Sequence, residues 1–247
     1  MQNRPLISVI IPAVNEAASL SVAAQNARSE TVAHEIIVAA APSEDGTASI
    51  AEKEGCFVVA CPQAHRARQM NLGAAHARGE VLLFLHADTI LPAGALDNIS
   101  CALANLRIVG GAFARRYDSR SCFLRFTCIL AELRSRTVGL FLGDQAIFVR
   151  RKVFDTLGGF REIEIFEDLD FSQRMRRAGA TMTLRPQVIS SGRRFEARGP
   201  FMTTCCDFLM TCQYAFGTDP RVIGAGFCNK SVARVRSEFM PEQRQQR

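Results

Sequence analysis

Short apolar segments alternate with longer amphipathic segments through the first half of the chain. Four apolar runs, each roughly five residues long, have the length of buried β-strands. The predicted strands are 7–11, 35–39, 56–60 and 81–85, and the predicted helices between them are 16–28, 47–54 and 66–78. Strands that are apolar throughout and separated by helices of this length predict a mostly parallel, Rossmann-like α/β sheet flanked by helices.

The second half is less regular. Its predicted helices are 92–106, 121–136, 167–178 and 201–216, and its predicted strands are 108–115, 146–150, 181–184 and 188–190. Pro12 is expected to end the first strand. No linker or repeat divides the chain, so we expect one domain over residues 1–230. The polar, basic segment 231–247 is expected to be a frayed tail.

The most informative polar residue follows the fourth strand directly. His86, Ala87 and Asp88 come next after the apolar run, so Asp88 lies at the carboxyl end of a strand, where open α/β sheets bind ligands. A carboxylate there suits a divalent cation that carries a phosphorylated substrate. A solvated loop aspartate is the plainer alternative.

Two further clusters follow the first and second strands. Residues 12–16 (PAVNE) offer Asn15 and Glu16 either as a helix cap or as nucleotide contacts. In residues 43–47 (SEDGT), Gly46 permits a tight turn and Asp45 or Ser43 suits a helix cap, which explains most of that composition.

Two charged clusters have less ordinary positions. Arginines open the helix at residues 66–71, where their charge opposes the helix dipole, so an anion is predicted to dock there; a solvated basic face is the alternative. Residues 162–170 hold five carboxylates whose mutual repulsion raises some of their pKa values, which suits a general base. Neighbouring arginines that neutralise the group are the alternative reading.

Composition excludes several classes of protein. The chain has 247 residues, is 48% hydrophobic, and carries a net charge of +6 supplied mainly by arginine, which favours an anionic substrate or membrane surface. No nucleic-acid module is present, and no run of about 18 apolar residues predicts a membrane span. Nine cysteines without a C-x-x-C pair predict reduced thiols and a cytoplasmic protein. Without a glycine-rich loop after the first strand, a dinucleotide oxidoreductase or nucleotidyltransferase is disfavoured.

Taken in order, these segments resemble the family-two glycosyltransferases of GT-A fold. The four matching pieces are 9–16 (VIIPAVNE), 43–47 (SEDGT), 84–89 (FLHADT), and 158–160 (GGF) followed by 167–170 (EDLD). Residues 68–74, 143–145 (GDQ) and 193–195 (RRF) are similar to a small bacterial subgroup. The likeness covers roughly residues 6 to 195, and four pieces in the right order are hard to obtain by chance.

The resemblance implies an inverting enzyme that moves a sugar from a nucleotide-diphosphate donor to an acceptor hydroxyl. Asp88 matches the last aspartate of the D-x-D motif and would bind Mg²⁺ or Mn²⁺, while His86 stands where the first acid usually lies. Asp168, beside Glu167, matches the general base. The implied donor-binding residues are Pro12, Asn15, Glu16, Asp45, Arg68, Asn71, Ala87 and Asp88, and the residues implied to close over acceptor or phosphate are Gly143, Asp144, Gln145, Arg193 and Arg194.

One departure from the family pattern concerns the donor base. Ala40 stands where the family commonly has an aspartate that contacts the nucleotide base, so Asp45 takes over, the nucleotide differs, or activity is lost. A catalytically inactive relative that binds a sugar nucleotide or a protein is therefore the rival hypothesis. The acceptor stays open among a lipid-linked sugar, a small metabolite and a protein. The apolar second-half helices leave contact with a membrane surface open, and oligomeric state is unknown.

Overall fold

The computed structural model describes residues 6–215, 218–220 and 222–223. The tail predicted at 231–247 and the domain end predicted at residue 230 lie outside these residues. The first half contains, in order, β1 (Ile7–Ala13), α1 (Ala17–Arg28), β2 (His34–Ala40), α2 (Thr47–Lys53), β3 (Phe57–Ala60), α3 (Arg66–His76), β4 (Val81–Phe84), β5 (Thr89–Ile90) and α4 (Ala95–Leu103). The second half contains β6 (Ile108–Tyr117), α5 (Cys122–Val138), the short 3-10 helix η1 (Gly143–Gln145), β7 (Ile147–Arg150), α6 (Arg151–Thr156), α7 (Glu167–Ala178), β8 (Ala180–Ser190), α8 (Arg193–Arg198) and α9 (Pro200–Ala215).

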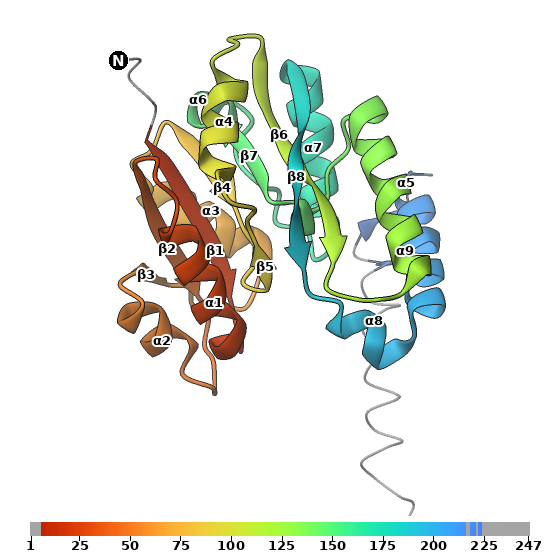
Figure 1. The fold of residues 1–247 in the computed structure, drawn as a ribbon, viewed down its shortest axis with the longest axis horizontal. Helices are drawn as coiled ribbons and strands as arrows, with labels where there is room; N and C mark the ends of the chain where they lie inside the picture. Colours follow the sequence, from red (N-terminus) through yellow and green to blue (C-terminus); the bar gives the residue numbers. More distant parts are fainter. Residues whose placement is uncertain (1–5, 216–217, 221, 224–247) are drawn as a thin grey trace, which may run out of the picture.

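The strands form one sheet in the order β3-β2-β1-β4-β7-β6-β8-β5 (Figure 1). Strands β1 to β4 run parallel to one another, as the alternation of apolar strands and helices predicts. Strand β7 runs antiparallel to both β4 and β6, whereas β6 and β8 are parallel. The predicted fold class, a mostly parallel α/β sheet between helices, is confirmed.

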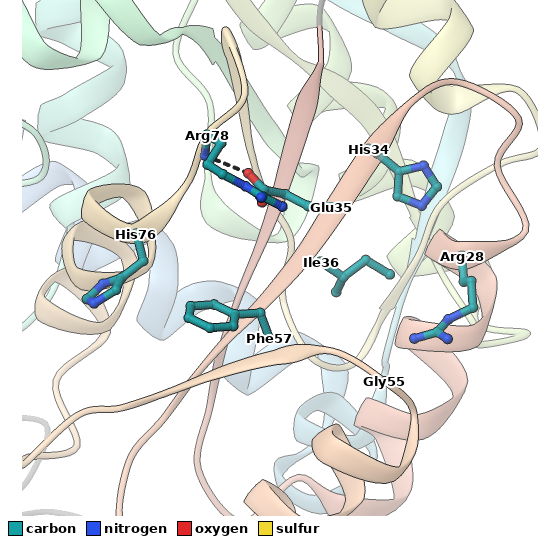
Figure 2. Close-up of a pocket in the computed structure, with 8 residues that line it drawn as sticks. All are labelled: Arg28, His34, Glu35, Ile36, Gly55, Phe57, His76 and Arg78. Atoms are coloured by element: carbon teal, nitrogen blue, oxygen red, sulfur yellow. Dashed lines mark hydrogen bonds and ion pairs between the residues drawn. The ribbon is translucent and has the colours of Figure 1, made fainter.

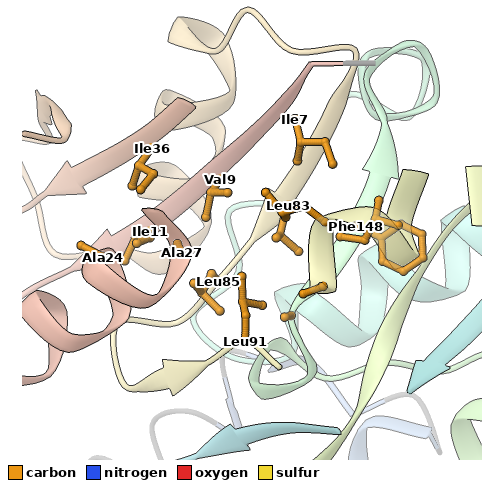
Figure 3. Close-up of a cluster of buried hydrophobic side chains, with 14 of the residues drawn as sticks. Ile7, Val9, Ile11, Ala24, Ala27, Ile36, Leu83, Leu85, Leu91 and Phe148 are labelled. Atoms are coloured by element: carbon orange, nitrogen blue, oxygen red, sulfur yellow. The ribbon is translucent and has the colours of Figure 1, made fainter. Parts of the chain in front are cut away.

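The core fills both faces of the sheet because the central strands are apolar on both sides. On one face, Val9 and Leu83 pack with α1 and α4; Figure 3 shows these side chains converging with Leu85 and Phe148. On the other face, Ile10 and residues of α3, α6 and α7 surround a second cluster. Its centre is a group of phenylalanines in ring contact: Phe84, Phe154, Phe160 and Phe171.

Two predictions about secondary structure are wrong in detail, and two short helices were not predicted. Strand β1 continues through Pro12 to Ala13. The backbone of Ile10 faces β4, because Ile10 O accepts from Leu85 N. Backbone groups alternate in direction along a strand, so that of Pro12 also faces β4. The last residue pair of β1 with β4 is Ile10 with Phe84, so no N–H is needed at position 12. The segments 181–184 and 188–190 form one strand, β8, that bulges at Pro186. The short helices α6 and α8 follow strands directly and were not predicted, since neither is long enough to show a period.

The carboxyl ends of β1, β2 and β4 meet at one edge, and a buried glutamine holds two of them together. Gln69, on α3, donates to Ala13 O (3.0 Å) and Ala39 O (2.8 Å). The segments that follow these strands therefore share one edge of the sheet, and η1, the start of α7 and the end of β8 approach the same region.

Candidate active site

Asp88 shares an arginine with Glu16, although the three residues are far apart in the sequence. Arg193, the first residue of α8, places its guanidinium 3.5 Å from Asp88 Oδ2 and 3.0 Å from Glu16 Oε2. Burial raises the pKa of Asp88 and the neighbouring Glu16 raises it further, while Arg193 opposes both effects. Two carboxylates that share one cation form a position suited to positive charge.

A divalent cation is the cofactor to test against this geometry. Among the described residues, no group of three or more His, Cys, Asp or Glu side chains is arranged to hold a metal ion. Mg²⁺ needs only one or two carboxylates when a substrate diphosphate and water supply the other oxygens. Asp88 already faces a cation, Arg193, so its carboxylate fits a metal bound together with a diphosphate.

Asp168, the second residue of α7, is held by two backbone N–H groups. Gly143 N donates to its Oδ2 (2.6 Å) and Leu169 N donates to its Oδ1 (2.6 Å). Burial raises the pKa of Asp168 to about 7, with a further contribution from the charge of Glu167 and an opposing one from these hydrogen bonds and Arg66. A carboxyl group that titrates near neutral pH is suited to proton transfer.

Glu167 precedes this residue and is itself buried. Its carboxylate pairs with Arg66 at the start of α3 (3.3 Å). Arg68, two residues along, pairs with Glu162 (2.6 Å). The basic start of α3 and the acidic stretch at 162–170 thus face each other. The anions that these arginines bind in the structure are carboxylates of the protein itself.

His86 lies near Asp168 in space and near Asp88 in the sequence. It lies two residues before Asp88, and a Cβ built on Gly143 would lie 2.5 Å from His86 Nε2 and 3.3 Å from Asp168 Oδ2. Its Nε2 is buried and has no hydrogen-bond partner among the described residues. Burial, assisted by Arg66 and opposed by Asp144, lowers the pKa of His86 to about 3, so the ring is neutral at pH 7.

Asp144 belongs to a network that the sequence did not reveal. Arg115 on β6 donates to both of its oxygens, and Tyr117 Oη donates to Oδ2 (3.0 Å). Burial raises the pKa of Asp144, but Arg115 and these hydrogen bonds hold it below its usual value. Residues two positions apart lie on the same face of a strand, so the spacing of Arg115 and Tyr117 could have indicated that both contact the same group.

The remaining loop residues serve mainly to connect the strand ends. Asn15 Oδ1 accepts from Glu44 N (2.9 Å), and Asp45 Oδ2 accepts from Ala17 N (2.9 Å). Gln145 is buried and donates to Phe113 O (3.1 Å). Pro12 is half-buried at the end of β1, and Ala40 and Ala87 are buried at the ends of β2 and β4.

Three other predicted site residues are engaged by partners within the chain. Asn71 donates to Phe160 O (2.8 Å) and accepts from Phe160 N (2.9 Å), which anchors the loop before α7. Arg194 pairs with Asp207 on α9. The structure therefore joins Glu16, Asp88 and Arg193 in one group and Gly143, Asp144, Glu167 and Asp168 in another, whereas Arg68, Asn71 and Arg194 bind other parts of the chain.

Backbone strain gathers at this edge of the sheet. Positive φ angles at non-glycine residues occur, among the described residues, at Asn15 (51°), Ala146 (51°) and Phe166 (67°). Each is next to a site residue: Asn15 precedes Glu16, Ala146 follows Gln145 at the end of η1, and Phe166 precedes Glu167. Such conformations cost roughly 1–3 kcal/mol each and gather at binding and catalytic sites.

A separate pocket of about 500 Å³ is lined by residues of β2 and β3 and by the ends of α1 and α3 (Figure 2). Figure 2 shows Arg28, His34 and His76 around it and the ion pair between Glu35 and Arg78 (3.0 Å). Its lining contains none of the residues described above, so it is not part of the candidate active site.

Three solved structures share this fold. The mannosyltransferase PcManGT from Pyrobaculum calidifontis, in complex with GDP-Man and Mn²⁺, has a TM-score of 0.64 at 22% identity. S. aureus TarS 1-349 has a TM-score of 0.63, and its complex with UDP-GlcNAc one of 0.60, both at 15% identity. These matches cover 77%, 75% and 75% of this chain but only 57%, 60% and 58% of the other chains. The present chain thus spans less than two thirds of their length.

Comparison with the sequences of curated proteins finds no match. The sequence model of glycosyl transferase family 2 matches residues 8–158, which include Asn15, Glu16, His86, Asp88 and Gly143. The match ends before Asp168 and Arg193, so these two residues are linked to the rest of the site by geometry. The matched residues make up more than half of the chain, and the GT-A architecture agrees with them: this protein belongs to glycosyl transferase family 2.

Proposed function

We propose that this protein transfers a sugar from a nucleoside-diphosphate donor to an acceptor hydroxyl, with inversion at the anomeric carbon and Asp168 as the general base. The observation that carries the proposal is the state of Asp168. Its pKa of about 7 suits proton uptake at neutral pH, and two N–H groups fix its orientation. The same edge of the sheet carries Asp88, whose carboxylate already faces a cation.

At the donor end, Asp88 would hold the divalent cation, which would offset the negative charge of the departing diphosphate. Glu16 and Arg193 border this position. The forked guanidinium of Arg193 is suited to pair with the phosphate oxygens of the donor. The loops at Asn15 and Asp45, after β1 and β2, border the nucleotide.

At the acceptor end, Asp168 accepts the proton of the attacking hydroxyl. The acceptor oxygen forms its bond to the anomeric carbon while the bond from that carbon to the phosphate oxygen breaks, and the electron pair leaves with the diphosphate. A single displacement from the opposite face inverts the configuration. Neutral His86, whose Nε2 lies near Asp168 across Gly143, is suited to hydrogen-bond the sugar without adding charge.

The structural neighbours contain GDP-Man in one case and UDP-GlcNAc in another, and both classes of donor are candidates for this chain. Ala40 offers no carboxylate to the nucleotide base, and the neighbouring Asp45 is engaged by Ala17 N and Thr47. This supports a second candidate function, an inactive relative that binds a sugar nucleotide without transferring it. Product formation separates the two.

Calorimetric titration with GDP-mannose and UDP-N-acetylglucosamine, each with and without Mn²⁺, tests the donor. We expect one of them to bind, and to bind more tightly with Mn²⁺. Release of nucleoside diphosphate and the anomeric configuration of the product, read by NMR, then test the transfer. Metal-dependent binding without turnover supports the inactive relative. Donor binding that is equally tight with and without Mn²⁺ contradicts the role of Asp88 as a metal ligand.

A further inference from the structure

Helix α5 carries apolar side chains on its outward face as well as on its inward face. Phe126, Ile129 and Leu133 are 56%, 64% and 57% exposed, and their spacing puts them on one face of the helix. The inward face is already apolar, since it buries Leu124, Cys128 and Ala131 together with Glu132 and Ser135. The outward apolar stripe therefore has no role in packing the helix against the core.

Helix α9 also exposes apolar side chains and lies beside α5. Phe201, Met202 and Phe208 are 67%, 62% and 66% exposed, while Thr203 is buried. The rings of Phe123 and Phe201, with centroids 5.8 Å apart, join the two helices. Figure 1 shows α5 and α9 together at the right edge of the molecule. We name the α5–α9 face by its outward residues: Phe126, Ile129, Leu133, Phe201, Met202 and Phe208.

The charge of the α5–α9 face is positive. The two acidic side chains of these helices are neutralised, because Glu132 pairs with Arg136 and Arg185 and Asp207 pairs with Arg194. Exposed Arg120 and Arg125, at the start of α5, have no ion-pair partner within the described part of the chain. Apolar side chains bordered by unpaired arginines match the composition of a surface that binds anionic lipid.

The inner sides of both helices reach the candidate active site. On α5, Arg134 donates to Gln145 Oε1 (3.4 Å). On α9, the ring of Tyr214 packs against Phe166 (5.1 Å between centroids), the residue before Glu167. A partner bound to the outer sides would therefore lie one helix layer away from Asp144 and Asp168.

We propose that the α5–α9 face docks on the surface of an anionic lipid bilayer. Phe126 and its neighbours enter the boundary between headgroups and acyl chains, and Arg120 and Arg125 pair with lipid phosphates. The contact is interfacial, since no described helix has the length and hydropathy to cross a membrane. A second copy of the chain is a poorer occupant, because pairing two such faces would oppose arginine to arginine. Resting on the proposed function, the consequence is that the acceptor is a lipid-linked molecule.

Sedimentation of the full chain with vesicles tests the docking. We expect binding to phosphatidylcholine vesicles that contain phosphatidylglycerol, weaker binding without it, and a decline with added salt. Phe126→Glu is expected to lower the vesicle affinity about tenfold or more, because an inserted phenylalanine is replaced by a charge. Phe57→Glu is the matched control, since Phe57 is also a phenylalanine that is 56% exposed but lies on β3.

Three results would overturn the docking: no vesicle binding by the wild type, equal loss in both variants, or a dimer that Phe126→Glu dissociates in the absence of vesicle binding. Size-exclusion chromatography with light scattering reads the dimer, and circular dichroism shows that both variants fold. Calorimetric donor titration of Phe126→Glu keeps this test separate from the proposed function. Intact donor binding with lost vesicle binding supports the docking, and vesicle binding without any donor binding leaves the docking in place while contradicting sugar transfer.

Discussion

The backbone N–H of Gly143 donates a hydrogen bond of 2.6 Å to Oδ2 of Asp168, a residue 25 positions further along the chain. This bond joins η1 to the start of α7 and leaves no space for a side chain at position 143, because a Cβ there would lie 2.5 Å from His86 Nε2. The glycine is thus required by close approach, and the carboxylate it holds is aimed at the region between η1 and β4.

Replacing Asp168 by Asn removes the base while retaining the shape of the side chain. We expect transfer to fall by about 10²–10⁴-fold, the usual contribution of general base catalysis. In the wild type, the rate should fall as the pH drops through about 7, because only the ionised carboxylate accepts a proton. Steady-state rates from pH 5 to 9 measure both effects. Glu164→Gln, an exposed neighbour in the same acidic stretch, is the control, and an unchanged rate in Asp168→Asn would refute the assignment.

The same carboxyl group should make stability depend on pH. The pKa of Asp168 is raised from 3.8 to about 7 in the folded protein, so its contribution is favourable at low pH and is lost as the pH rises through 7. Asp168→Asn sets an amide NH2 against one of the two backbone N–H groups at every pH, but it has no charge to gain. The Tm of the wild type, measured relative to this variant, should therefore be lower at pH 8 than at pH 5, by roughly 2–5 °C for a chain of this size. Thermal unfolding at both values checks this, and an equal shift at both would contradict the raised pKa.

Asp88→Asn tests the cation position. An amide has no charge to hold the metal, so we expect donor binding to lose its dependence on Mn²⁺ and transfer to fall by about 10²-fold or more. The fold should persist, because Asp88 is only half-buried and its sole ion pair is with Arg193 among the described residues. Calorimetry with and without Mn²⁺ gives the result. Asp155→Asn, at an exposed position on α6, should retain the metal effect.

Asn71 is predicted by resemblance to bind the donor, but its side chain both donates to and accepts from the backbone of Phe160. Asn71→Asp retains the acceptor and removes the donor, so Phe160 O loses its partner. We expect a loss of about 1–3 kcal/mol in the free energy of unfolding, measured with urea. Asn105→Asp is the control, because the described contact of the Asn105 side chain uses only its acceptor oxygen. Unchanged stability with weakened donor binding would restore the donor-contact interpretation.

The elements of the fold that depend on local sequence pattern could be predicted from the sequence. The four apolar strands of the first half appear within one residue of their predicted starts, and each is followed by the predicted helix or loop. The resemblance to family-two glycosyltransferases and the α/β class are confirmed by the family match and the shared architecture. The roles of Asp88 and Asp168 stay predictions, with the geometry described above in their support.

What the tertiary structure decided is which distant residues meet. The contact between Arg193 and Glu16 spans 177 positions, and the pairing of Asp144 with Arg115 depends on β7 entering the sheet between β4 and β6. The hydrophobic pattern of a strand indicates which of its residues are buried, but it does not indicate which other strand it pairs with. The neutral state of His86 and the raised pKa of Asp168 have the same origin, because burial and neighbouring charges exist only after the chain has packed.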